Sequence, residues 1–272
     1  MSGLQKIIKY LAIAFALFLT FSIISGIIYT ISFIGNLLDD NSKSITEKLN
    51  NLEINENTSL LDINISSSNI TIKKGNTFKV ETNNKYINSK QDKNKLYITE
   101  RKHNWFNHNE NNKLIVYVPS DFIFDRVAIE SGASKVNIEE LSTKQLYLDL
   151  GAGKVMINNL TVLENAKIDG GAGETIIKSS NIHNLDLEMG VGRLSLSSKL
   201  TGNNKIDSGI GEMNLSLLGT LDDYCIILDK GLGSAIINGK NMNDDTTYGT
   251  GENKLDIDGG VGSIQIDFIE NR

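Results

Sequence analysis

An acidic residue recurs at regular spacing through the second half of this 272-residue chain. It stands two residues before each copy of a Gly-apolar-Gly unit, at Glu130, Asp149, Asp169, Glu188, Asp207, Asp229 and Asp258. If the copies stack about 4.8 Å apart, neighbouring carboxylates repel each other by roughly 1 kcal/mol even in water. The sequence therefore predicts a group that offsets this repulsion.

Two kinds of partner fit these carboxylates. In the first, each carboxylate accepts hydrogen bonds from N–H groups of the glycine turn that follows it, as in Asx turns. In the second, the row of oxygen ligands takes up Ca²⁺. The weak calcium candidates are Asp149, Asp169, Glu188, Asp207 and Asp229. Residues 170–174 resemble a calcium-binding nonapeptide, but the period here is 19–20 residues, so turn capping is the favoured interpretation and no cofactor is expected.

Two polar loops are candidate binding sites. The loop 101–112 holds the adjacent aromatics Trp105 and Phe106, which could contact a sugar, a lipid headgroup or a protein, or could cover one end of the fold. Its two histidines, at 103 and 108, lack a third ligand, so no metal site is expected. The loop 238–254 is either a binding loop or a neutral insertion. Its binding candidates are Asp244, Asp245 and Tyr248.

Catalytic motifs do not occur in the chain. It contains no nucleophile elbow, phosphate loop or His-Glu-x-x-His, and His183 stands alone in a turn. Paired carboxylates could act on a polysaccharide, but an enzyme needs one pair whose pKa values are driven apart, and this column is uniform. We therefore predict that the protein is not an enzyme.

The glycine units define a repeat that positions these carboxylates. Its seven copies begin at Gly132, Gly151, Gly171, Gly190, Gly209, Gly231 and Gly260, with spacings of 19, 20, 19, 19, 22 and 29 residues. Apolar residues recur three positions before the first glycine and four and six positions after it, which predicts two short strands for each copy. The residue between the glycines is apolar in all seven copies, and we expect it to point inward at a corner.

Fixed-period similarity of this kind predicts an all-β solenoid of stacked coils, each of about 19–20 residues. An antiparallel sandwich is the rival, but it would not place identical residues at fixed offsets. We expect regular coils over 131–272 and irregular coils or a cap over 58–130, with strands at 61–65, 69–72, 78–80, 96–98 and 114–118. The two longest spacings hold residues inserted away from the glycine corner.

The N-terminal region predicts a membrane anchor. Residues 10–38 carry no charged side chain and are long enough to span a bilayer as a helix. Lysines precede this segment and two aspartates follow it, which predicts a cytoplasmic tail at 1–9, a stalk at 39–57 and an extracytoplasmic remainder in a single-pass cell-membrane protein. A cleaved signal peptide is the alternative, although its apolar stretch should be about 7–15 residues long.

Charge and cysteine content exclude other classes. The formal net charge of −6 gives no electrostatic footprint for nucleic acid. A single cysteine, Cys225, cannot form an intrachain disulfide, and its apolar neighbours predict a small buried side chain.

The exported part resembles the bacterial β-strand-repeat family of unknown function known as putative adhesins, related to head-GIN adhesin domains. The resemblance rests on residues 63–67 and 70–72, the strand 114–119 and the repeated glycine units, and it covers about residues 60–269. It implies a solenoid-like fold in an envelope protein and defines no catalytic residues. Ser134, in place of a second glycine, departs from the pattern.

Two functions follow from anchor, repeat and resemblance together. The first is an adhesion or envelope-binding module whose partner is a cell-wall polymer, a host protein or an envelope protein. The second is an accessory of cell-envelope stress signalling that acts through lateral contacts. A polysaccharide-acting enzyme ranks third.

Overall fold

The computed structural model describes residues 49–52, 54, 58–101 and 111–269. In these residues, eighteen strands form one hydrogen-bonded sheet, so the fold is all-β and consistent with a solenoid. The strands expected before the regular repeat are confirmed: they are β2 (Leu60–Ile65), β3 (Asn69–Lys74), β4 (Lys79–Thr82), β6 (Lys95–Glu100) and β7 (Lys113–Val118). Pro119 follows β7 directly, where a missing N–H costs least.

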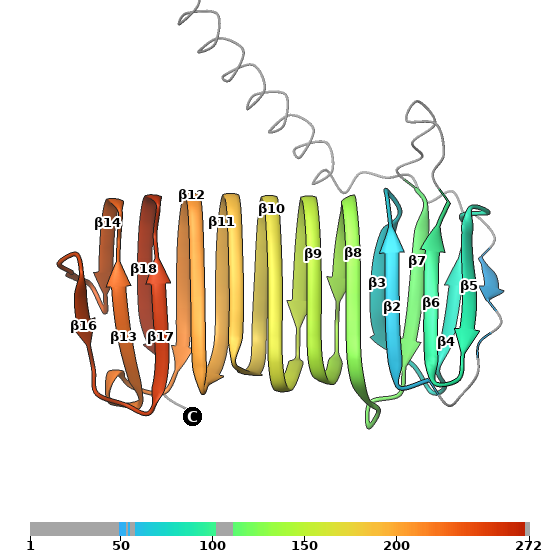
Figure 1. Cartoon of the computed structure of the whole chain (residues 1–272), viewed down its shortest axis with the longest axis horizontal. Coiled ribbons are helices and arrows are strands. Elements are labelled where there is room, and N and C mark those ends of the chain that lie inside the picture. The colour runs from blue at the N-terminus through green and yellow to red at the C-terminus, as the bar shows by residue number, and fades with distance from the viewer. Residues whose placement is uncertain (1–48, 53, 55–57, 102–110, 270–272) are drawn as a thin grey trace, which may run out of the picture. The chain divides into compact units, whose positions relative to one another are not determined.

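Five long strands make the centre of the sheet and lie side by side in chain order (Figure 1). They are β8 (Ile123–Ile138), β9 (Leu141–Asn158), β10 (Leu160–His183), β11 (Leu185–Thr201) and β12 (Asn203–Leu218). Neighbours pair in parallel, and the glycine units of adjacent strands are in register. Each strand runs through its glycine unit without a break, so one strand supplies two sides of a coil.

The predicted inward positions form the core. Every residue three before the first glycine, and every residue four or six after it, is buried, as Ile168, Thr175 and Ile177 illustrate. Stacking the coils joins these side chains into one continuous apolar column, and burying each Ile or Leu contributes about 1.5–3 kcal/mol.

The residue between the two glycines does not point inward, and this prediction was wrong. Val191, Ile210, Val261 and Leu232 are 48%, 54%, 45% and 78% exposed. The residue before the unit already points inward, as Leu150 and Met189 do, and the next two residues both face out. The second glycine, with φ between +138° and +155° in the five copies of β9–β12 and the last strand, then turns the chain back into alternation.

Glycine is required at this corner because adjacent backbones touch there. A Cβ on Gly192 would lie 1.8 Å from the carbonyl oxygen of Gly173, and one on Gly211 would lie 1.7 Å from that of Gly192. No side chain could occupy that space while the strands kept their hydrogen-bonding distance.

At the C-terminal end, the coils are not stacked in chain order. After β12 come β13 (Tyr224–Asp229) and β14 (Leu232–Ile237), and later β17 (Asn253–Asp258) and β18 (Val261–Ile269). The later pair lies between β12 and the earlier pair: β12 contacts β17 and β18, which in turn contact β13 and β14. A 3-10 turn (η2, Leu221–Asp223) begins the passage to the outer coil.

The N-terminal end repeats this inversion. The coil of β2 and β3 pairs with β8 on one side and with the outer coil of β6 and β7 on the other. Antiparallel strands border the outer coil: β5 (Ile87–Asp92) pairs with β6, β4 pairs with β7, and β1 (Asn50–Leu52) pairs with β4. The stretch 39–57, expected as a stalk, thus contributes a strand.

Several expectations fall on residues that the structure does not describe. The tail 1–9, the apolar segment 10–38, and Trp105 and Phe106 with the two neighbouring histidines lie outside the described residues. Within the described ranges, no helix is long and apolar enough to cross a membrane.

Candidate interaction surface

The exposed residues between the glycines form one ridge along the corner of the coils. In spatial order, the corner ridge consists of Ala133, Ala152, Ala172, Val191, Ile210, Val261 and Leu232, each in register with the next. The glycine units thus do more than allow a turn: they display one apolar side chain per coil.

The ridge becomes more apolar and more exposed toward the C-terminal coils. The three alanines are half-buried, whereas the four larger side chains are each at least 45% exposed. Glycines flank six of the seven ridge residues on both sides, so the chain neighbours of these six carry no side chain that could cover them. A contiguous exposed apolar strip with polar flanks is typical of an interaction site.

The predicted acidic column borders one flank of the ridge. The register places Glu130, Asp149, Asp169, Glu188, Asp207, Asp258 and Asp229 in one line. At the two C-terminal coils the aspartate caps the glycine turn: Gly231 donates its N–H to Asp229 Oδ1 at 2.9 Å, and Gly260 donates to Asp258 Oδ1 at 3.4 Å.

Lysines of the adjacent column offset the charge further along. Lys205 Nζ lies 2.6 Å from Asp207, and Lys167 Nζ lies 3.5 Å from Asp169 and 4.0 Å from Asp186. The carboxylates of Asp169 and then Asp186 raise the pKa of Lys167, and the hydrogen bond to Asp207 raises the pKa of Lys205. Within the described ranges, no three His, Cys, Asp or Glu side chains converge as metal ligands would.

On the other flank, charges of opposite sign alternate from coil to coil. Lys154 Nζ lies 2.9 Å from Glu174, and Arg193 lies 3.9 Å from Glu174 and 3.1 Å from Glu212. The Asn214 amide, followed by Arg193, lowers the pKa of Glu212. Surface pairs like these contribute about 0–1 kcal/mol each, so they add little to the stability of the stacked coils.

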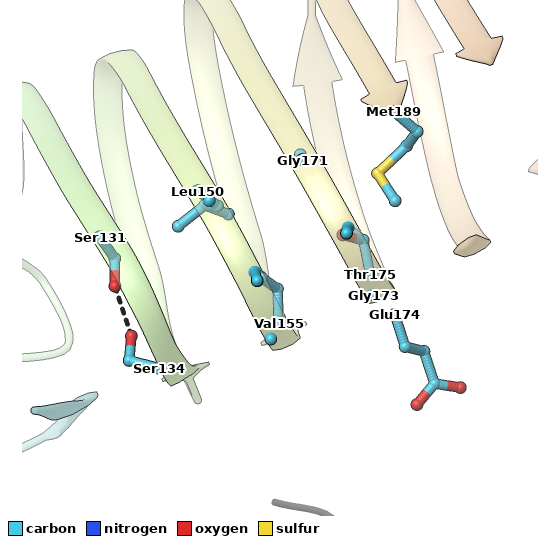
Figure 2. Close-up of a pocket in the computed structure, with 14 residues that line it drawn as sticks. Ser131, Ser134, Leu150, Val155, Gly171, Gly173, Glu174, Thr175 and Met189 are labelled. Carbon is cyan, nitrogen blue, oxygen red and sulfur yellow. Dashed lines mark hydrogen bonds between the residues drawn. The ribbon is translucent and has the colours of Figure 1, made fainter. Parts of the chain in front are cut away.

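The interior beneath the corner is nearly filled. Figure 2 shows the space between Leu150, Val155, Thr175 and Met189, near a hydrogen bond between the Ser131 and Ser134 hydroxyls. The cavity measures about 20 Å³, which is room for one water molecule at most. Ser134 replaces the usual second glycine and is buried, so its hydroxyl needs this partner.

The candidate residues of the loop 238–254 belong to a cap. This loop forms β15 (Lys240–Asn241) and β16 (Thr246–Tyr248), which pair antiparallel with β14 and β13. Asp244 Oδ1 accepts the Lys230 N–H at 2.7 Å, and the Tyr248 hydroxyl accepts the Asn243 N–H at 2.8 Å. Asp245 takes a left-handed turn conformation, with φ of 48°. Asp244 thus joins the cap to the outer coil, whereas the Tyr248 contact lies within the cap.

Cys225 is free and only half-buried on the outer side of β13, next to Lys254, so its expected burial is not met.

The corner ridge was not predicted from the sequence, because strict alternation places the residue after an outward-facing glycine inside. The signal was present: flanking glycines break alternation at a corner, and side-chain size rises along the column.

Comparisons with known proteins give two similar solved structures and one protein family. A putative cell adhesion protein from Clostridium sporogenes ATCC 15579 matches 82% of this chain and 99% of its own, at 15% identity and a TM-score of 0.37. A putative adhesin (BF0245) from Bacteroides fragilis NCTC 9343 matches 82% of this chain and 96% of its own, at 14% identity and a TM-score of 0.33. None of the curated proteins compared with the chain matches it significantly. The family model for Toastrack DUF4097 matches residues 58–227, more than half of the chain, which therefore belongs to that family.

Proposed function

We propose that the protein is a non-enzymatic, extracytoplasmic binding module of the adhesin type, held to the cell membrane by residues 10–38. The corner ridge is the observation that carries this proposal. Folding requires glycines at the corner, but it does not require an apolar side chain between them to face solvent at every coil.

The partner that fits the ridge is a protein with an apolar groove bordered by basic side chains. The exposed half of the ridge, from Val191 to Leu232, fills such a groove, and the acidic column beside it provides the complementary charge. We therefore expect salt to slow the association of this partner with the ridge, because charge complementarity at the rim of an interface acts mainly on the association rate and is screened by salt. An accessory role in envelope-stress signalling predicts that this partner is another membrane protein.

Site-specific crosslinking on intact cells tests the proposal with the full chain. A photoreactive amino acid replaces Val261 on the ridge or, as the matched control, the exposed Gln265 on the same strand. We expect a crosslinked protein of distinct mass from position 261 and none from position 265, and we expect Ile210→Asp to abolish it.

Three outcomes overturn the proposal. They are equal crosslinking from both positions, adducts only with a second copy of the chain, and adducts only with polysaccharide. Release of reducing sugar from wall polymer by the purified chain would contradict its non-enzymatic character.

A further inference from the structure

A hollow on the third side of the coils lies away from the corner ridge. Each central coil ends in a short strand segment that closes the coil opposite the corner, such as Leu160–Val162, Ser180–His183 and Ser198–Thr201. Their inward residues are buried, and the residues between them face out. Asn181 is in register with Lys199, and His183 with Thr201.

Two irregularities in β10 lie beside this hollow. The register of β10 shifts between Val162 and Asn165 against β9, and between Ile177 and Ser180 against β11. The first shift pushes Leu163 outward, where it is 49% exposed. Such bulges re-aim side chains at sheet edges and near sites. The hollow measures about 240 Å³.

The lining of the hollow combines an apolar wall with polar side chains and one cation, Lys199. The apolar residues are Val162, Leu163 and Ile182, and the other polar residues are Thr161, Asn181, His183 and Thr201. No acidic side chain lines it. Within the described residues, no carboxylate lies within ion-pair distance of Lys199. The charge of Lys199 contributes to lowering the pKa of the Asp223 carboxyl. That carboxylate, however, accepts hydrogen bonds from the Thr220 N–H and hydroxyl at 2.7 and 3.0 Å.

His183 and Thr201 together leave one donor for a ligand in either tautomer. Their contact joins His183 Nδ1 and Thr201 Oγ1 at 3.0 Å. If Nδ1 accepts the hydroxyl proton, the neutral ring keeps its other N–H free; if Nδ1 carries the proton, the hydroxyl proton stays free. The pair therefore offers one donor in the hollow that Lys199 also lines.

We propose that this hollow binds an anionic group, a phosphate or a carboxylate, with Lys199 as counter-ion and the His183–Thr201 pair as donor. Its volume lies below the usual 300–1,000 Å³ of small-molecule pockets, so it suits one anionic group with a small apolar substituent against Leu163. This site does not depend on the corner ridge or on the proposed function.

Thermal unfolding of the full chain in detergent tests the proposal. The probes are inorganic phosphate and sodium acetate, each against sodium chloride at equal ionic strength. Phosphate raises the unfolding temperature of many proteins that have no phosphate-binding site. The shift in unfolding temperature of the unaltered chain is therefore compared with that of Lys199→Gln and that of Lys240→Gln, which alters an exposed lysine on the cap. We expect Lys199→Gln to weaken the apparent affinity about tenfold or more, Thr201→Val several-fold, and Lys240→Gln not at all.

A second comparison tests the apolar wall and the source of the charge. Phenyl phosphate should bind several-fold more tightly than inorganic phosphate in the unaltered chain, and equally in Leu163→Ser. A larger response to phosphate than to acetate assigns a phosphate, and the reverse assigns a carboxylate. Responses to both anions that persist unchanged in Lys199→Gln and Thr201→Val would overturn the proposal.

Discussion

The centre and the two ends of the sheet use the same coil but hold it differently. From β8 to β12, coils stack in chain order, and each contacts only its neighbours through glycine corners and a shared core. At both ends the order inverts. The coil of β2 and β3 lies between the centre and the coil of β6 and β7, and the coil of β17 and β18 lies between the centre and the coil of β13 and β14. Antiparallel strands border the outermost coil at each end. The centre is therefore stabilised by repetition, and the ends by chain excursions that cover open edges.

The glycine corner of the centre should be the least tolerant position in the molecule. Gly192→Ala places a Cβ 1.8 Å from a backbone carbonyl oxygen, which no side-chain movement relieves. We expect a loss of about 4 kcal/mol or more in unfolding free energy, measured by urea denaturation. Gly239→Ala is the matched control, because Gly239 also has positive φ (75°) but meets no atom within 4 Å. It should cost only about 1–2 kcal/mol; equal losses would mean that φ, and not backbone contact, requires the glycines.

The inserted C-terminal coil should behave like a central coil although it comes last in the chain. Ile257 is fully buried between β12 and β13, so Ile257→Ala should cost about 3 kcal/mol, as Ile168→Ala should in the centre. Urea denaturation of both variants checks this expectation. A much smaller loss for Ile257→Ala would show that β17 frays like a chain end and would contradict the inverted order.

The sequence predicted the inside of the coils better than their order. Positions such as Ile129, Val136 and Ile138 followed from alternation within each strand, because a buried column requires the same residue type at every copy. The order at the C-terminal end could not follow, because the glycine units at 231 and 260 are both compatible with stacking on Gly209. Only the three-dimensional arrangement shows Gly260 against Gly209, with Gly231 outside.

Part of the candidate surface was also predicted from the sequence, namely the acidic column but not the groups that contact it. The acidic column was expected from spacing, and its register is observed. The lysines that offset it were not expected, although Lys167 and Lys205 stand two residues before Asp169 and Asp207 on the same strands and therefore share their face. The role of Asp244 as a cap depends on Lys230, fourteen residues earlier, which comes close only because the outer coil needs a cover.

The cap offers a smaller test of how the ends are held. Asp244→Ala removes the acceptor of the Lys230 N–H and should cost about 1 kcal/mol. It should also promote association between chains, because the edge of β13 and β14 loses part of its cover. Urea denaturation and sedimentation velocity measure the two effects. Asp245→Asn, which keeps a residue tolerant of positive φ, should change neither; association that rises equally in both variants would argue against edge protection.

The smallest expected effect lies in the crossover that carries the chain past the inserted coil. The Thr220 N–H and then the Thr220 hydroxyl hold the pKa of Asp223 below its ordinary value of 3.8. A depressed folded-state pKa means that the carboxylate's contribution to stability is complete above the ordinary pKa and is lost as pH falls through the folded value. Asp223→Asn should therefore lower stability slightly at neutral pH and flatten its dependence on pH below about 4. Urea denaturation across that range, with Asp222→Asn as the control, measures the difference. The loop that holds Asp223 connects β12 to β13, past the inserted coil of β17 and β18. If Asp223→Asn left the pH dependence unchanged, the acid-sensitive group would lie elsewhere. That result would weaken the link between the order of the coils and the hydrogen bonds of this loop.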